Sequence, residues 1–185
     1  KSLKQMEAVN VPKVHDINIT GKGVMMTNID DGFEWRSHQA LNTLAVLSER
    51  DFVNNDDKVS KEDFNKFPES FSQGDHGTAT LSLMSGIKDG KLVSPAFDAN
   101  ILLAKTEYIT TETPMEEDFW LEACEWAELQ GTDIITSSLN YKIFDAPYDS
   151  NTYSYKDMNG NRAITTIAAD RSAYLGIVVC SSMGN

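Results

Sequence analysis

Short apolar segments alternate along this chain with segments whose apolar residues recur at helical spacing, and this alternation restricts the possible folds more than any other feature. Parallel strands that are connected through helices form a sheet covered on both faces, and such strands are apolar along most of their length. The sequence therefore predicts an α/β fold with three α/β/α layers and a mainly parallel sheet. Four segments have the character of its strands: residues 24–29, 99–106, 133–139 and 177–180.

The helix between the second and third of these strands has the clearest boundaries. Thr113 can cap the free amides of its first turn, Pro114 suits that turn, and Glu116 completes a capping box. Gly131 is expected to end the helix. Other helices are expected near residues 3–9, 76–85 and 164–175.

Two further segments carry structural expectations. Residues 49–74 are polar and predict a surface loop, whereas residues 176–180 predict a buried strand. Because a core strand needs cover, we expect the sheet to be incomplete at the C-terminus and the chain to continue beyond Asn185. Cys124 and Cys180 lie in apolar stretches and are interpreted as small buried hydrophobic residues, with a disulfide left open.

The charge balance and hydropathy exclude two classes of partner. Asp and Glu total 28 against 16 Lys and Arg, which gives a net charge of -12. Such a field repels phosphate backbones, so nucleic acid is not an expected partner. No apolar run reaches the ~18 residues of a membrane span. Neither a Gly-rich dinucleotide loop nor a phosphate-binding loop follows any predicted strand, which argues against a nucleotide-binding domain.

Three polar residues stand where an α/β sheet binds ligands, beyond the carboxyl ends of its strands. Asp30 follows the first strand and could orient a histidine. His76 begins a predicted helix, whose dipole disfavours a charged imidazole and keeps the ring available as a base. Asn185 follows the last strand, where its amide could donate to an oxyanion. Each residue taken alone also fits a turn, a cap or an exposed surface position.

The order of several motifs resembles the subtilase family, the subtilisin-like S8 peptidases. A Gly-x-Gly-Val segment leads through a strand to Asp30, within residues 21–32, and His-Gly-Thr stands at residues 76–78. Ser-Leu-Asn at residues 138–140 follows a later strand, and Gly-Asn stands at residues 184–185. The resemblance runs from about Val11 to Asn185 and implies that residues 1–185 are the N-terminal portion of a single catalytic domain.

The resemblance implies a serine endopeptidase that hydrolyses polypeptides through a Ser-His-Asp triad. Asp30 would orient His76, His76 would act as general base and then general acid, and Asn185 would stabilise the oxyanion. No Gly-Thr-Ser motif is present, so the nucleophilic serine would lie beyond residue 185. The family also implies export, to an extracellular or periplasmic location, and no redox or nucleotide cofactor. The substrate backbone would pair as an added strand with Ser138, Leu139 and Asn140.

Departures from the family pattern have chemical consequences. Asp31 replaces Ser or Thr and adds a negative charge beside Asp30, and Asn140 replaces a Gly in the cleft. Residues 39–41 are Gln-Ala-Leu where many members have Pro-Asp-Leu, so Ala40 stands in place of a calcium-ligating Asp, and the segment 86–95 is short for a calcium loop. These departures argue against calcium at that site.

Two other functions remain open from the sequence. One is a catalytically inactive, subtilase-like binding module. The other is a metal hydrolase that uses Asp30, Asp31, His38 and His76, although the chain lacks a compact ligand motif such as His-Glu-x-x-His.

Overall fold

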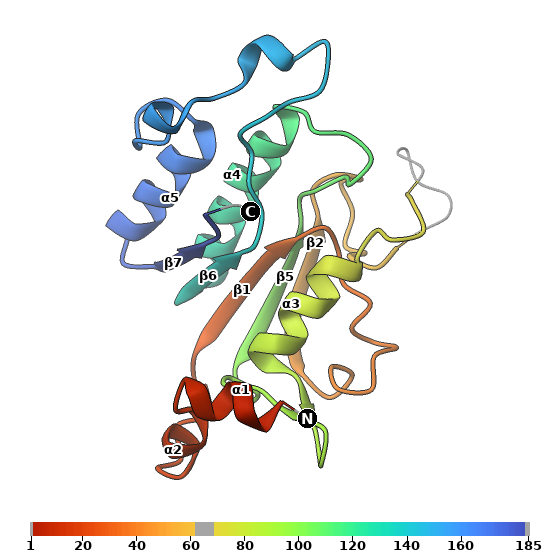
Figure 1. Cartoon of the computed structure of the whole chain (residues 1–185), viewed down its shortest axis with the longest axis vertical. Coiled ribbons are helices and arrows are strands. Elements are labelled where there is room, and N and C mark those ends of the chain that lie inside the picture. Colours follow the sequence, from red (N-terminus) through yellow and green to blue (C-terminus); the bar gives the residue numbers. More distant parts are fainter. Residues whose placement is uncertain (1, 62–68, 184–185) are drawn as a thin grey trace.

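A five-stranded parallel sheet forms the centre of the molecule, in a computed structural model that describes residues 2–61 and 69–183 (Figure 1). Its strand order is β2-β5-β1-β6-β7. The predicted α/β class and parallel sheet are therefore confirmed. The strands are β1 (Met25–Asp30), β2 (Ala45–Asp51), β5 (Asn100–Lys105), β6 (Ile134–Ser137) and β7 (Val178–Ser181).

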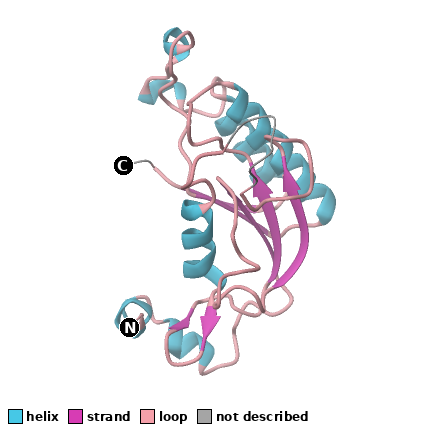
Figure 2. Cartoon of the chain, turned by 90° about the vertical axis from the view of Figure 1, so that its right-hand side faces the viewer, coloured by secondary structure: helices cyan, strands magenta, loops and turns pink. Residues whose placement is uncertain are grey.

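Helices cover both faces of the sheet, as expected for parallel strands (Figure 2). Helix α3 packs on one face, and the pair α4 and α5 packs on the other. No helix within the described residues is long and apolar enough to cross a membrane. The helices are α1 (Leu3–Ala8), α2 (Val11–His15), α3 (Asp75–Ser85), α4 (Met115–Gln130) and α5 (Ile164–Tyr174), with short 3-10 turns at Asp149–Asn151 and Tyr155–Asp157 and a hairpin of β3 (Ile87–Lys88) and β4 (Leu92–Val93).

Side chains alternate between the two faces along the central strands, and they build one core on each side. In β5, Leu103 is fully buried in the cluster that contains Leu81 of α3. The next residue, Ala104, belongs to the opposite cluster with Trp120 and Ala123 of α4. Burying each large apolar side chain contributes roughly 1.5–3 kcal/mol, so the two clusters hold β1 and β5 firmly between the helices.

The edges of the sheet differ from the sequence prediction. Strand β2 was not expected, and its end falls inside the predicted loop 49–74, because an edge strand with mixed polar residues lacks an apolar signature. Strand β7 exists but is not buried: Val178 is 56% exposed, and Cys180 is exposed. Its only hydrogen-bonded neighbour among the described strands is β6. Cys124 is buried as predicted, and both cysteines are free.

Most predicted helix boundaries are confirmed. Gly131 ends α4 with a φ of 83°, and the Glu116 carboxylate accepts the backbone N–H of Thr113 at 2.9 Å. The N-cap residue is Pro114 and not Thr113, and it makes no side-chain capping bond, so only the Glu116 half of the predicted capping box forms. The N-terminal helix is split in two, with Pro12 in the first turn of α2.

A buried cluster of charged side chains lies at the carboxyl ends of β2 and β5. Lys105, at the end of β5, is fully buried, and its ammonium group lies 2.8 Å from the carboxylate of Asp51, at the end of β2. It also pairs with Glu69. Because the main-chain N–H of Thr106 then donates to the Asp30 carbonyl, this cluster helps to fix the end of the strand that carries Asp30.

Candidate active site

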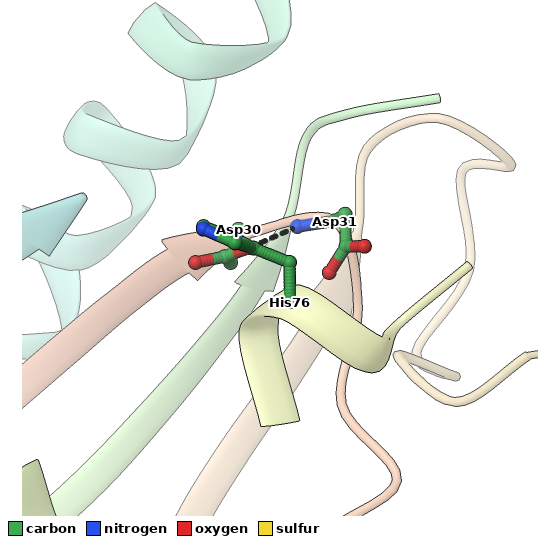
Figure 3. Close-up of side chains that lie close together, drawn as sticks. All are labelled: Asp30, Asp31 and His76. Carbon is green, nitrogen blue, oxygen red and sulfur yellow. Dashed lines mark hydrogen bonds and ion pairs between the residues drawn. The ribbon is translucent and has the colours of Figure 1, made fainter. Parts of the chain in front are cut away.

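Asp30 and His76 form a hydrogen-bonded pair at the carboxyl edge of the sheet (Figure 3). Asp30 is the last residue of β1 and is completely buried, whereas His76 is the second residue of α3 and its side chain is 52% exposed. The distance between Nδ1 of His76 and Oδ1 of Asp30 is 2.6 Å. The sequence prediction placed these two residues side by side from motif order, and the structure brings them together.

The Asp30 carboxylate is held by further donors. The backbone N–H of Asp31 donates to Oδ1 at 2.9 Å, and the Thr80 hydroxyl donates to Oδ2 at 3.0 Å. With its carboxylate fixed, Asp30 holds Nδ1–H of His76 and directs the other ring nitrogen away from the strand. Nε2 is thus left for a partner outside this pair, as a general base requires.

The charge environment of His76 differs from the sequence expectation. Partial burial lowers the pKa of His76, but the hydrogen bond and charge of Asp30, together with the charge of Asp31, outweigh that effect and raise the pKa above 6.5. The carboxylates of Asp30 and Asp31, at and just after the end of β1, stabilise the imidazolium more than partial burial of the ring destabilises it.

Asp31 has a positioning role that the sequence reading missed. Its buried carboxylate accepts the backbone N–H of Gly77 at 2.8 Å and that of Gly74 at 3.1 Å, so it caps α3 from a different element. Burial raises the pKa of Asp31, the Gly77 amide lowers it, and the Asp30 charge raises it, with a net rise to about 6. The capped amides lie 43 and 46 residues away in sequence, so no local capping pattern could reveal this role.

Gly77 allows α3 to approach the end of β1 this closely. A Cβ at this position would stand 2.9 Å from Cβ of Asp30 and still closer to the carbonyl oxygen of Gly32. The small residue directly after His76 therefore sets the distance between α3 and the end of β1.

A cleft of about 830 Å³ opens beside His76. Ser138, Leu139 and Asn140 line it, as do Asp31 and His76. Ser138 and Asn140 are exposed, whereas Leu139 is buried and its carbonyl accepts the Ser182 hydroxyl at 2.9 Å. The predicted oxyanion residue, Asn185, lies outside the described residues, so its role stays a prediction.

Three of the four residues of the metal-hydrolase alternative lie close together. Among the described residues, Asp30, Asp31 and His76 have potential ligand atoms within 4.8 Å of one another, and His38 is not in this group. Both Asp31 oxygens accept backbone amides, and both Asp30 oxygens accept other donors. The four-residue set of that alternative therefore does not come together, and the oxygens that it would use already hold α3 and His76.

The parallel α/β sheet thus presents a buried Asp and a half-exposed His at its carboxyl edge, beside an open cleft, which is the arrangement of an acid–base pair. The model of the subtilase family matches residues 21–185. The chain belongs to the subtilase family.

Solved structures share this fold. The crystal structure of MycP1 with its N-terminal propeptide removed superposes with a TM-score of 0.62 at 17% identity, covering 95% of this chain and 47% of that one. Fervidolysin from Fervidobacterium pennivorans, described as a keratinolytic enzyme related to subtilisin, gives 0.59 at 17% identity, covering 91% and 22%. The chain thus spans about half of MycP1 and a smaller part of fervidolysin. None of the curated proteins compared with the chain matches it.

Proposed function

We propose that the protein containing this chain is a serine endopeptidase of the subtilisin type, and that residues 1–185 form the N-terminal portion of its single catalytic domain. The observation that carries the proposal is the 2.6 Å bond between Asp30 and His76 at the mouth of the cleft. Membership of the subtilase family supports it. The family resemblance also supports an exported enzyme that needs no redox or nucleotide cofactor.

In this mechanism His76 uses Nε2 to take the proton from a serine hydroxyl supplied by the remainder of the domain, beyond residue 185. The serine oxygen attacks the peptide carbonyl, and His76 then returns the proton to the leaving amine. Asp30 holds the tautomer of the ring and stabilises the imidazolium. Asn185 donates to the oxyanion. The peptide backbone pairs with the segment Ser138, Leu139 and Asn140.

A serine-directed fluorophosphonate probe tests this proposal on the whole protein. We expect labelling of one serine beyond residue 185, together with cleavage of an unstructured polypeptide. His76→Ala should remove nearly all cleavage and labelling, because the hydroxyl loses its base. Peptide binding without labelling or cleavage by the unaltered protein would instead identify the inactive binding module.

A further inference from the structure

The cleft beside His76 carries an imbalance of charge. The carboxylates that line it are those of Asp31, Glu107, Glu112 and Asp145, against a single ammonium group, that of Lys142. Within the described residues Lys142 makes no ion pair with any of them. These four carboxylates form a negatively charged side of the cleft next to His76, which we call the cleft wall.

Glu107 is held at a fixed place in this wall. It lies two residues beyond β5, and its carbonyl accepts the Nε2 amide of buried Gln73 at 2.8 Å. The backbone N–H of Ile109 donates to Oε1 of the same glutamine at 3.2 Å. Gln73 also donates to the Asp31 carbonyl, so one buried side chain ties the cleft wall to the end of the catalytic strand.

The carboxylates in and behind the cleft wall differ in whether they accept hydrogen bonds from the protein. Glu116, behind the wall, accepts the backbone N–H groups of Tyr108 and Thr113, at 3.0 and 2.9 Å. In the part of the chain that the structure describes, the side chains of Glu107 and Glu112 have no such donor. A ligand in the cleft can therefore contact these two carboxylates while neither is hydrogen-bonded to the protein.

Crowding of like charges is strongest at Glu107. Burial raises its pKa, and the charges of Glu112, Asp30, Asp31 and Glu116 raise it further, to about 8. Burial and the charge of Asp145 raise the pKa of Glu112. A cation bound against Glu107 counters these effects and favours its ionised carboxylate.

Building on the proposed peptidase function, we propose that this cleft selects substrates with a lysine or arginine side chain on the N-terminal side of the scissile bond, and that Glu107, assisted by Glu112, is the specificity-determining residue. A cationic side chain between these carboxylates replaces repulsion by charge-assisted hydrogen bonds. The same carboxylates repel an acidic substrate side chain, so the cleft wall favours basic substrates and disfavours acidic ones.

Matched peptides test this on the whole protein. The series places lysine, arginine, norleucine, citrulline or glutamate at each of four positions before one cleavable bond. We expect kcat/KM for the best basic peptide to exceed that of its neutral isostere ~10- to 100-fold, the range of a hydrogen bond to a charged group. Citrulline keeps the length and shape of arginine, so that ratio isolates the charge, whereas norleucine keeps the four carbons of lysine and removes its ammonium group.

Glu107→Gln should reduce this ratio to within a fewfold of one, because the amide keeps the size of the side chain but not its charge. Glu128→Gln, on the exposed side of α4, removes the same formal charge far from the cleft and should leave the ratio unchanged. Cleavage without a preference for basic residues, or a preference that survives Glu107→Gln, overturns the inference while leaving the peptidase function intact.

Binding separates this inference from the proposed function. In the His76→Ala protein, equilibrium binding of fluorescent lysine and norleucine peptides reports the charge of the cleft without turnover. Tighter binding of the lysine peptide that is lost on adding Glu107→Gln supports the inference even where the unaltered protein cleaves nothing. Equal binding of the two peptides overturns it.

Discussion

Replacing Gly77 by alanine tests how closely the helix that carries His76 must approach the catalytic strand. An ideal Cβ on Gly77 would stand 2.2 Å from the Gly32 carbonyl oxygen, whereas real Cβ atoms essentially never come within 3.0 Å of such an atom. Helix α3 and the backbone at Gly32 must therefore move apart by at least the difference between these two distances. The bond between His76 and Asp30, now 2.6 Å, would stretch toward or beyond the ~3.2 Å limit of a good hydrogen bond.

A misplacement of ~1 Å costs on the order of 10²-fold in rate, so we expect Gly77→Ala to lower kcat/KM by about this factor. The assay is peptide hydrolysis by the whole protein, with folded enzyme counted by circular dichroism and thermal unfolding. Ser82→Ala is the matched control, since its hydroxyl donates only within α3, to the Ala79 carbonyl. Wild-type kcat/KM in folded Gly77→Ala would refute the argument that this contact sets the catalytic distance.

Asp30→Asn should lower kcat/KM ~10⁴-fold by losing the tautomer and charge support of His76. Catalysis needs the neutral imidazole, so wild-type activity should fall on acidification through a pKa above 6.5. In Asp30→Asn the acid limb of the pH–activity profile should move to lower pH. An unmoved limb would contradict the assignment. Lys105→Met should reduce the free energy of unfolding, measured in urea, by ~3–5 kcal/mol, because Asp51 stays buried without its cation. Adding Asp51→Leu should recover part of this loss. If nothing is recovered, the broken ion pair is not the cause of the loss. Asn140→Gly should change the accepted residues before the scissile bond in a peptide library with little change in Tm, and an identical cleavage profile would mean that this side chain points away from the cleft.

The central strands and the Asp30–His76 pair could be predicted because each leaves a local pattern. Strand β5 is apolar along most of its length since helices cover both faces, and the two site residues stand in short motifs at element ends. Strand β2 could not be predicted in this way, because an edge strand tolerates Ser48, Glu49 and Arg50. The exposure of β7 depends on its neighbours in space, and its apolar sequence gives no sign of it.

The charge environment of the site was the part least accessible from sequence. The place of His76 at the start of a helix can be inferred locally, but the carboxylates that raise its pKa stand more than 40 residues away in sequence. Long separations, of 34 to 46 residues, also concealed Asp31 as the cap of α3 and Gln73 as the link to residues 107–109. Long-range side-chain bonds to backbone groups have no sequence period, so only the fold reveals them.

Gln73 binds the cleft wall through main-chain groups alone, the carbonyl of Glu107 and the N–H of Ile109. These hydrogen bonds therefore do not depend on which side chains residues 107 and 109 carry. Substitutions at residues 107 and 109 can change the chemistry of the cleft while the path of the backbone, and its distance from Asp30, stay the same. Substrate preference in this fold can thus diverge between relatives, or be redesigned in the laboratory, without rebuilding the acid–base pair.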